Sequence, residues 1–463
     1  MVITQVYIDP NFIGISDGTI SNPYRAFPIF IKDTVYLLKS DTILTLNNTL
    51  IVNADNVIIS SYGEGKKPII YNPISTRRTI TITGNNVKLI GICSKMPKAE
   101  SYDLGEWNIA LMNKERKEVE LTIDNCDIIG GSPAVHSFMS TSVTVLNSTI
   151  IKACYDSYYG EFVDNVTFKN CIIKDMDWDT NDLSQDLIHI KHAKNIIIDN
   201  CVLDHNFPGK YCIIAHQDNA GFDDTKLLVT NTKMIASNET EACVKASVPY
   251  NEFKNCQFIG GKRSMQDVWS NLTVDNCLFV SDSPDMIQGI SWCDYPSIKN
   301  STFIGMNNPY LGQTNPENTI FWNCKGGGDD WKNSIVDPNF DTSYNATGIL
   351  KGVGYISAGI VIIEPPVEPP VEPPVNNDVE ELKQQIVELE QKLSEMTYMY
   401  NEGVKLLGLL QDEYDKISNI LKLNQIIIEQ KAILQECYNI FLKSTISSAI
   451  KLIIRTKIES YIN

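Results

Sequence analysis

The stretch IIIDNCVLDHN at 196–206 carries the pattern on which the fold prediction depends. Apolar residues alternate up to Asn200, Cys201 follows it, and apolar residues then alternate again. Alternation with a period of two indicates a β-strand on each side of a small polar corner. The same arrangement recurs along the chain around Asn125, Asn147, Asn170, Asn200, Asn231, Asn255, Asn276, Asn300 and Asn323.

These asparagines are regularly spaced, lying 22, 23, 30, 31, 24, 21, 24 and 23 residues apart. A period in the low twenties with no helical stretch between the strands predicts a mainly β fold, a parallel β-helix spanning residues 1–355. Its coils should stack about 4.8 Å apart. Each buried Asn amide should then donate to the next Asn carbonyl along the stack.

The residue after each asparagine is Cys, Ser or Thr, which predicts a neighbouring stack of small buried side chains. Free cysteine is among the most buried residue types, so we expect a structural role for the cysteines in this position. No CxxC pair or zinc-finger spacing occurs among the twelve cysteines of the chain. The six cysteines in this position are Cys126, Cys171, Cys201, Cys256, Cys277 and Cys324.

Composition restricts the partners of the chain. Its net charge is −17, from 39 basic and 56 acidic side chains, so nucleic acid is not an expected partner. No window reaches the roughly 18 apolar residues that a membrane span needs. The start, MVITQVYIDP, lacks a basic segment followed by an apolar one, so we expect no secretory signal.

The C-terminal quarter has a different pattern. EPPVEPPVEPPV (364–375) predicts an extended proline-rich linker over 356–377. From residue 378 onward, apolar residues such as Val379, Leu382, Ile386 and Leu389 are spaced by three and four, which predicts a helical region over 378–463. We expect a coiled coil, most plausibly trimeric; a helical hairpin or bundle is the alternative.

The densest polar stretch is KDMDWDTNDLSQDLIHIKH (174–192). Its acidic residues include Asp182 and Asp186, and His189 follows on an alternating strand. A loop rich in carboxylates can hold Ca²⁺, which prefers oxygen ligands. A solvated acidic loop and a structural histidine are the alternatives.

Aromatic residues lie near this stretch in the sequence, and their faces would suit the C–H faces of sugars. A sugar-stacking platform and ordinary loop packing both remain open. These residues are Tyr155, Tyr158, Tyr159, Trp178 and Tyr211.

Both ends of the repeat region resemble those of known proteins. YIDPNFIGISDGTISNPYRAF (7–27) resembles the opening segment of many secreted or viral right-handed β-helix proteins. VDPNFDTSYNATGILKGVGY (336–355) resembles their closing segment. The resemblance implies a right-handed β-helix with a segment at each end.

The run from 186 to 238 resembles the core of the calcium-dependent pectate lyases. The matching segments are LIHIKH, IIIDNCVLDHN, GKYCIIAHQDN and DDTKLLVTN, which cover about 50 to 70 residues in the family's order. In that family, acidic residues on adjacent coils hold Ca²⁺, which bridges substrate carboxylates. A basic side chain, usually arginine, then abstracts a proton for β-elimination.

The resemblance implies a role for several residues of this chain. The Ca²⁺ ligands would be Asp156, His189 and either Gln185 or Asp186, and the acidic stretch itself adds Asp182 as a candidate ligand. Lys210 would contact substrate, beside the aromatic candidates Tyr158, Trp178 and Tyr211. The family's arginine segment is replaced by EACVKAS (241–247), so Lys210 and Lys245 are the candidate catalytic cations. Both are also ordinary surface lysines by pattern, and the missing arginine leaves enzymatic activity undecided.

A β-helix, a proline-rich linker and a coiled coil in one acidic chain together resemble bacteriophage tailspikes and tail fibres. This resemblance implies a virion protein, made in the host cytoplasm, that recognises host surface polysaccharide and joins other virion proteins through its C-terminal helices. An active polysaccharide lyase or depolymerase is the first alternative. A purely structural decoration or head-fibre protein is the second.

Overall fold

The computed structural model describes residues 4–357 except 75, 98–105, 113–118, 178–184, 206–207, 218–223, 269–270, 282–287, 291–295, 310–315, 326–333 and 335. The chain divides into two compact units, Met1–Val367 and Glu368–Asn463. The expected coiled coil and nearly all of the expected linker lie outside the described residues. In the part described, no helix is long and apolar enough to cross a membrane.

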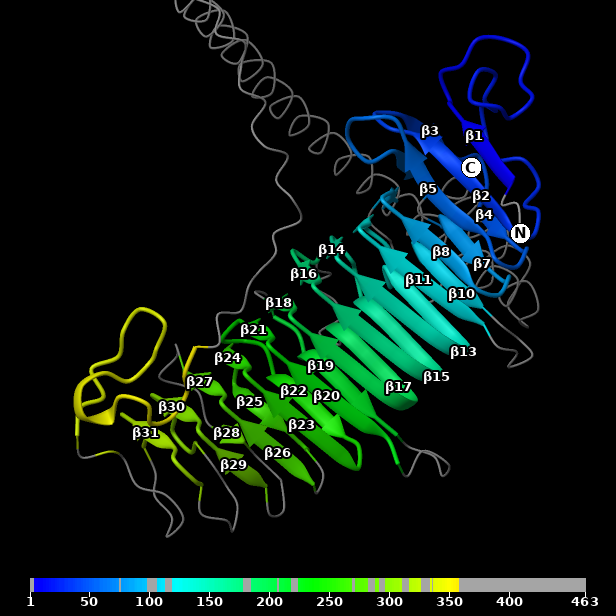
Figure 1. The fold of residues 1–463 in the computed structure, drawn as a ribbon. Helices are drawn as coiled ribbons and strands as arrows, with labels where there is room; N and C mark the ends of the chain where they lie inside the picture. Colours follow the sequence, from blue (N-terminus) through cyan, green and yellow to red (C-terminus); the bar gives the residue numbers. More distant parts are fainter. Residues whose placement is uncertain are drawn as a thin grey trace, which may run out of the picture. The chain divides into compact units, whose positions relative to one another are not determined.

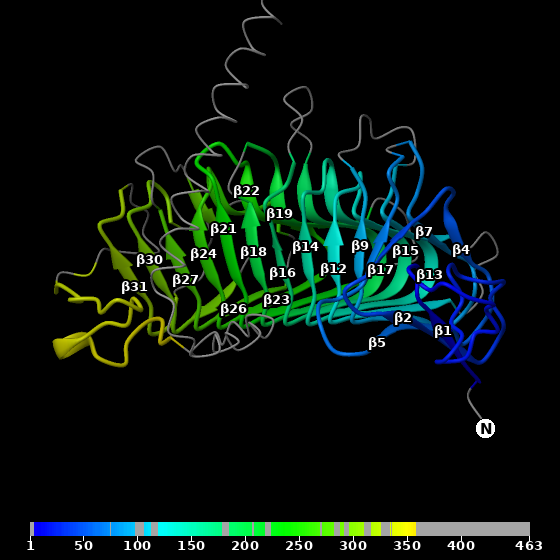
Figure 2. The same cartoon turned by 90° about the horizontal axis from the view of Figure 1, so that it is seen from above.

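The first unit is a parallel β-helix. All strand pairs in the two described sheets are parallel, and successive coils stack strand on strand (Figure 1). Each regular coil contributes a strand to a first, a second and a third face in that order. The first and second faces belong to the larger sheet, because three long strands bend across both. The third face is the smaller sheet, seen along its length in Figure 2.

The long strands are β13 (Val135–Leu146), β15 (Asp156–Lys169) and β17 (Asp186–Asp199). Their first halves lie in the first face and their second halves in the second face.

The other strands of the first face are β4 (Leu50–Val52), β7 (Ile80–Ile82), β10 (Ile109–Met112), β19 (Tyr211–His216), β22 (Ala242–Ser247), β25 (Arg263–Gln266) and β28 (Gln288–Ile290).

The other strands of the second face are β1 (Thr4–Ile8), β2 (Thr34–Lys39), β5 (Ile58–Tyr62), β8 (Val87–Ile90), β11 (Glu120–Asp124), β20 (Lys226–Thr230), β23 (Tyr250–Lys254), β26 (Leu272–Asp275) and β29 (Ser297–Lys299).

The strands of the third face are β3 (Ile43–Thr45), β6 (Ile69–Tyr71), β9 (Cys93–Lys95), β12 (Asp127–Ile129), β14 (Thr149–Ile151), β16 (Ile172–Lys174), β18 (Val202–His205), β21 (Lys233–Ala236), β24 (Gln257–Gly260), β27 (Leu278–Val280), β30 (Thr302–Ile304) and β31 (Ile320–Trp322).

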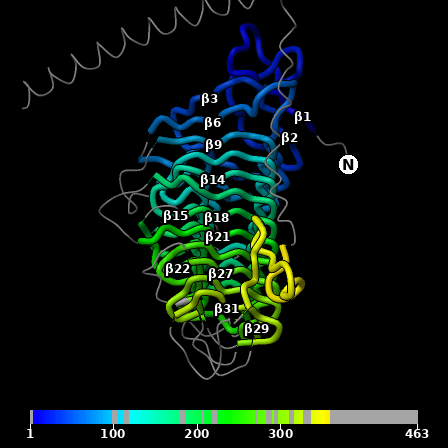
Figure 3. The backbone as a smooth tube through the Cα atoms, turned by 90° about the vertical axis from the view of Figure 1, so that its left-hand side faces the viewer, coloured from blue at the N-terminus to red at the C-terminus, as the bar shows by residue number. Residues whose placement is uncertain are grey.

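The interior is one continuous apolar core, as the alternation predicts. One cluster of buried side chains runs from Ile8 to Cys324. Because the coils stack in register, like side chains lie on like side chains. On the third face, the ring centroids of Phe258, Phe279 and Phe303 are 4.6 and 4.3 Å apart and their planes are nearly parallel. The sequential stacking of coils is visible in Figure 3.

The corner between the second and third faces depends on asparagine. Asn170 and Asn200 have φ of 54° and 51°, in the left-handed region that asparagine tolerates better than most residues. The Nδ2 of Asn200 donates to Oδ1 of Asn170 at 2.9 Å, and the Nδ2 of Asn170 donates to Oδ1 of Asn147 at 2.9 Å. The expected Asn-on-Asn hydrogen bonds are therefore present in this part of the corner.

The asparagine ladder differs from the prediction in two ways. It is interrupted where Asn147, Asn231 and Asn300 donate instead to the carboxylates of Asp124, Asp199 and Asp275, each at 2.8 Å. Its amides are also half-buried or exposed, whereas we expected buried ones. The buried stack at this corner is formed by the following residue: Cys201, for example, is 0% exposed.

The last rung of the ladder is Asn318, so the placement of Asn323 was wrong. Asn318 donates to Oδ1 of Asn300 at 2.8 Å, whereas Asn323 follows β31 at the far end of the third face. The sequence NTIF at 318–321 fits the repeat pattern as well as the segment around Asn323 does. The pattern alone could not choose between two overlapping frames.

The cysteines at the corner are structural. Cys126, Cys171, Cys201, Cys256 and Cys277 are buried and reduced, as predicted. Their thiols point to main-chain carbonyls; that of Cys171 lies 3.3 Å from the carbonyl oxygen of Lys169. Burial raises the pKa of Cys126 to about 12, which keeps this thiol protonated and unreactive.

The corner can be tested at Asn170, whose amide bonds to the coils on both sides. Asn170→Ala should lower the free energy of unfolding by about 2–3 kcal/mol, because it loses two amide hydrogen bonds and places alanine at positive φ. Asn170→Gly keeps the backbone free to adopt this φ and should cost about 1 kcal/mol less. Denaturant unfolding of both variants checks this. Equal losses would show that backbone conformation is not the constraint.

Candidate functional site

A cluster of ionisable side chains lies on the first face where β15 and β17 begin. Asp156 and Asp186 are in register on neighbouring coils, and His189 is in register with Tyr159. Ligand-type atoms of Asp156, Asp186 and His189 all lie within 4.8 Å of one another. We call these three residues the Asp–His cluster.

Both carboxylates are anchored by main-chain groups of the following coil. The N–H of Asp186 donates to Oδ1 of Asp156 at 3.1 Å, and the N–H of Tyr211 donates to Oδ1 of Asp186 at 2.9 Å. Each Oδ1 therefore accepts a main-chain N–H that a main-chain carbonyl of the neighbouring strand would otherwise accept. This fixes the carboxylates and directs each Oδ2 towards His189.

His189 contacts both carboxylates and a second histidine. Its Nδ1 lies 3.4 Å from Oδ2 of Asp156 and 3.5 Å from Oδ2 of Asp186, which is long for N–H···O hydrogen bonds. Its Nε2 lies 3.1 Å from Nε2 of His216, so one of these two nitrogens donates to the other. His216 extends the cluster towards the end of β19.

Burial dominates the electrostatics of the cluster. Asp156 is 0% exposed and Asp186 is 2% exposed. Burial, followed by the Asp156 charge, raises the pKa of Asp186 well above its ordinary value. Burial lowers the pKa of His189 despite the opposing effect of the Asp186 carboxylate. Strongly perturbed groups that converge in this way are typical of functional sites.

The structure thus brings together three of the four predicted metal ligands. The fourth, Asp182, and the predicted sugar contact Trp178 lie outside the described residues. Ca²⁺ takes six to eight oxygen ligands, whereas the cluster offers one carboxylate oxygen from each aspartate and one imidazole nitrogen. The described donors therefore do not fit Ca²⁺, and we derive no function through that ion.

Two predicted sugar contacts, Tyr158 and Tyr211, were wrong. Tyr158 is fully buried, and its hydroxyl is hydrogen-bonded to that of Ser137 at 2.7 Å. Tyr211 is 5% exposed, and its ring lies beneath Lys245. Both side chains belong to the packing of the coils, so neither offers a face on which a sugar could stack.

The predicted lysines have different settings. Lys210 is exposed just before β19, and its charge acts on both Asp186 and His189. Lys245 lies on β22, where its Nζ is 3.2 Å from Oδ2 of Asp267. The structure therefore gives Lys245 the setting of a paired cation.

The sequence analysis missed a row of stacked rings that leads to the cluster. Trp107 stacks on His136 at 3.9 Å, His136 on Tyr159 at 5.4 Å, and Tyr159 meets His189 edge-on at 4.8 Å. Arg78 lies over Trp107 at 4.2 Å. Aligning VHS at 135–137 with YYG at 158–160 and IHI at 188–190 would have revealed this row.

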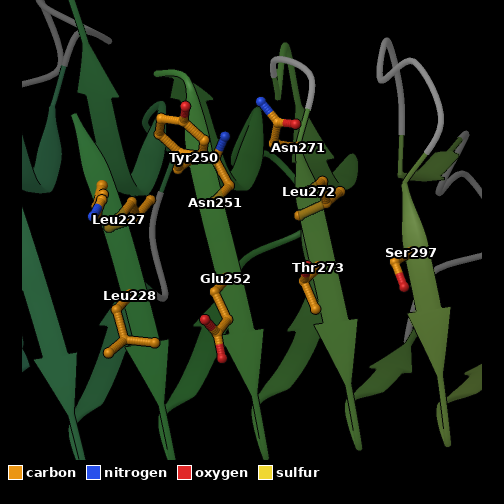
Figure 4. Close-up of a pocket in the computed structure, with 10 residues that line it drawn as sticks. Leu227, Leu228, Tyr250, Asn251, Glu252, Asn271, Leu272, Thr273 and Ser297 are labelled. Atoms are coloured by element: carbon orange, nitrogen blue, oxygen red, sulfur yellow. The ribbon is translucent and has the colours of Figure 1, made fainter. Parts of the chain in front are cut away.

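A separate groove of about 560 Å³ lies on the outer side of the second face (Figure 4). Leu228, Glu252, Thr273 and Ser297 line it from four strands in register. Tyr250 at its edge is 47% exposed. No cluster of buried ionisable groups adjoins it within the described residues, so we regard it as the second candidate surface.

A family model described as a right-handed β-helix region matches residues 108–224. The match covers the whole Asp–His cluster and agrees with the handedness that the terminal segments imply. No curated protein matches the chain.

Several solved structures are similar to this chain at low identity. A lacto-N-biosidase from Eubacterium ramulus is 10% identical with a TM-score of 0.31, over 70% of this chain and 67% of that chain. A pectate lyase is 12% identical with a TM-score of 0.36, over 69% and 74%. The A-module of a mannuronan C-5 epimerase from Azotobacter vinelandii is 11% identical with a TM-score of 0.39, over 63% and 86%. At these values the likeness says nothing about the activity of this chain.

The ring stack makes the stability of the protein sensitive to pH through His136. Burial, aided by Arg78, lowers the pKa of His136 from 6.5 to about 3. Between these values the unfolded chain binds a proton that the folded chain does not. The free energy of unfolding should therefore fall as the pH is lowered from about 6.5 towards 3, by up to about 1.4 kcal/mol per pH unit from this group.

His136→Gln removes the titrating group and should flatten this part of the profile. Denaturant unfolding of both proteins across the window measures the difference, in which contributions from other groups cancel. Parallel profiles would show that His136 is protonated in the folded protein.

Proposed function

We propose that this protein recognises an acidic polysaccharide along the outer side of the first face, around the Asp–His cluster. The observation that carries the proposal is the pair of lysines beside the cluster, Lys191 and Lys210, whose charges both act on His189. In the described part of the chain neither lysine has an ion-pair partner. Two cations without an ion pair at one place on a chain of net charge −17 favour an anionic ligand, although Glu161 is in register with Lys191.

The surroundings of the lysines suit a sugar chain. The Nζ of Lys191 lies 6.0 Å from the centroid of the Tyr159 ring, and Lys210 comes from the next coil. Carboxylates of a uronic-acid polymer would pair with these ammonium groups, and its hydroxyls would lie beside the imidazole of His216. The face continues over several coils, which gives room for more than one sugar unit.

We propose recognition without β-elimination. The cation that replaces the lyase arginine is Lys245, and Asp267 holds its ammonium at 3.2 Å. Lys210, the other candidate cation, is exposed just before β19. An active lyase or depolymerase remains the alternative, and turnover distinguishes the two.

Binding to immobilised acidic and neutral polysaccharides tests the site. Lys191→Ala and Lys210→Ala should each weaken binding to the acidic ligand about 3- to 10-fold, and salt should weaken binding by the wild type. Lys254→Ala, an exposed lysine at the far edge of the second face, is the matched control. If Tyr250→Ala loses binding while the two lysine substitutions have no effect, the binding site is the second-face groove.

The same mixtures test turnover. Incubation with polygalacturonate, with and without Ca²⁺, should produce no ultraviolet absorbance from unsaturated uronides. If product appears and Lys245→Ala removes it, the protein is a lyase.

We further propose that the chain is a virion appendage of the tailspike or tail-fibre kind, joined as a homotrimer to other virion proteins by residues 378–463. The support is in the sequence: the tripled EPPV tract precedes apolar residues spaced by three and four. Sedimentation of the full chain should give a trimer, and removal of 364–463 should give a folded monomer. A monomeric full chain would exclude attachment as a homotrimer and favour a helical hairpin or bundle in residues 378–463.

A further inference from the structure

The geometry of the Asp–His cluster points to a bound metal other than Ca²⁺. We propose that Oδ2 of Asp156, Oδ2 of Asp186 and Nδ1 of His189 bind one divalent d-block cation of the Zn²⁺ type. This inference does not rest on the glycan, because it follows from the arrangement of the three donors.

Two of the three donor separations are close to those of a tetrahedral ion, and the third lies within 4.8 Å. Zn²⁺ bonds to carboxylate oxygen and imidazole nitrogen at about 2.0–2.1 Å, so the donors of a tetrahedral site are separated by roughly 3.3–3.4 Å. Nδ1 of His189 lies 3.4 and 3.5 Å from the two Oδ2 atoms. These contacts are long for hydrogen bonds but close to the edges of such a tetrahedron.

Two of the donor atoms lack another role. Nδ1 of His189 is buried and makes no hydrogen bond. Asp186 is 2% exposed, and the described residues include no hydrogen-bond donor to its Oδ2. A buried polar atom without a partner is costly, and these two atoms lie within 4.8 Å of each other and of a carboxylate oxygen of Asp156.

The remaining atoms of the three side chains form the supporting contacts that metal ligands require. The two Oδ1 atoms accept main-chain N–H groups, which fixes the carboxylates. A metal at Nδ1 of His189 leaves the proton on Nε2, which can then donate to His216 at 3.1 Å. Such outer contacts set the tautomer and orientation of ligating histidines.

Charge and ligand type lead to the same class of ion. Two buried carboxylates close together repel each other, and a divalent cation would cancel their charge. Imidazole is a ligand typical of Zn²⁺, Cu²⁺, Ni²⁺ and Fe²⁺, whereas Ca²⁺ and Mg²⁺ prefer all-oxygen sites. Three protein ligands also leave a fourth position for water or a ligand oxygen, as in sites that bind substrate.

Metal binding to the chelator-treated full chain, with no purification tag, tests the proposal. Zn²⁺ should raise the melting temperature and bind with a stoichiometry of one by calorimetry, whereas Ca²⁺ and Mg²⁺ should do neither. Co²⁺ should give the visible absorption of a four-coordinate site without a thiolate charge-transfer band, which excludes binding by the cysteines. Stabilisation by Ca²⁺ alone would overturn the assignment.

Variants separate ligands from neighbours. Asp186→Asn and His189→Ala should abolish the Zn²⁺ shift, and His216→Ala should lower affinity about 10- to 100-fold while keeping the stoichiometry. His136→Gln, a change to another histidine of the first face, should bind Zn²⁺ as the wild type does. The Co²⁺ spectrum is recorded on each variant after circular dichroism shows it folded. An unchanged spectrum in Asp186→Asn or His189→Ala would refute the site.

Discussion

The left-handed turn between the second and third faces is the constraint on which the rest of the fold depends. In every coil the chain must change direction at this corner within one residue. The side chain of the next residue must then be small enough to fit in the interior. Asparagine meets the first requirement at Asn170 and Asn200, and Cys171 and Cys201 meet the second. Because the turn recurs at one place in each coil, it sets the register of every strand that follows it.

The functional cluster is a product of this register. Asp156 and Asp186 are 30 residues apart in sequence and Tyr211 follows after another 25, yet all three are paired across adjacent strands. The coils differ in length because residues are added between strands of different faces, as between Lys174 and Asp186 and between His216 and Lys226. Such additions leave the corner unchanged. The cluster therefore lies beside the longest connections but is held by strands.

Much of the fold follows from the sequence, because period-two alternation and the Asn-Cys corner are local properties. Asp156, Asp186 and His189 were also predictable as a set, because a motif resemblance placed them on adjacent coils. Tyr158 and Tyr211 were not, since a pattern of aromatics does not reveal which side of a strand each occupies. The prediction that Asn323 belongs to the asparagine ladder was wrong for a different reason. Two overlapping segments fit the repeat, and only main-chain pairing selects Asn318. The ring stack depends on which residues lie in register across coils of unequal length. An alignment of the first-face strands can reveal that register, whereas residue composition cannot.

The first face combines features that a purely structural surface would avoid. Burying Asp156 and Asp186 side by side costs free energy that apolar residues at the same positions would not cost. The rest of the core shows that the coils can fill such positions with apolar side chains, as they do at Ile188, two residues beyond Asp186 on β17, and at Ile213, its partner on β19. The carboxylates are moreover held by main-chain donors that keep their second oxygens turned towards His189. The cost and the fixed orientation of the two carboxylates are the reasons for proposing a functional site here. The exposed Lys210 beside them places the proposed site at the outer surface.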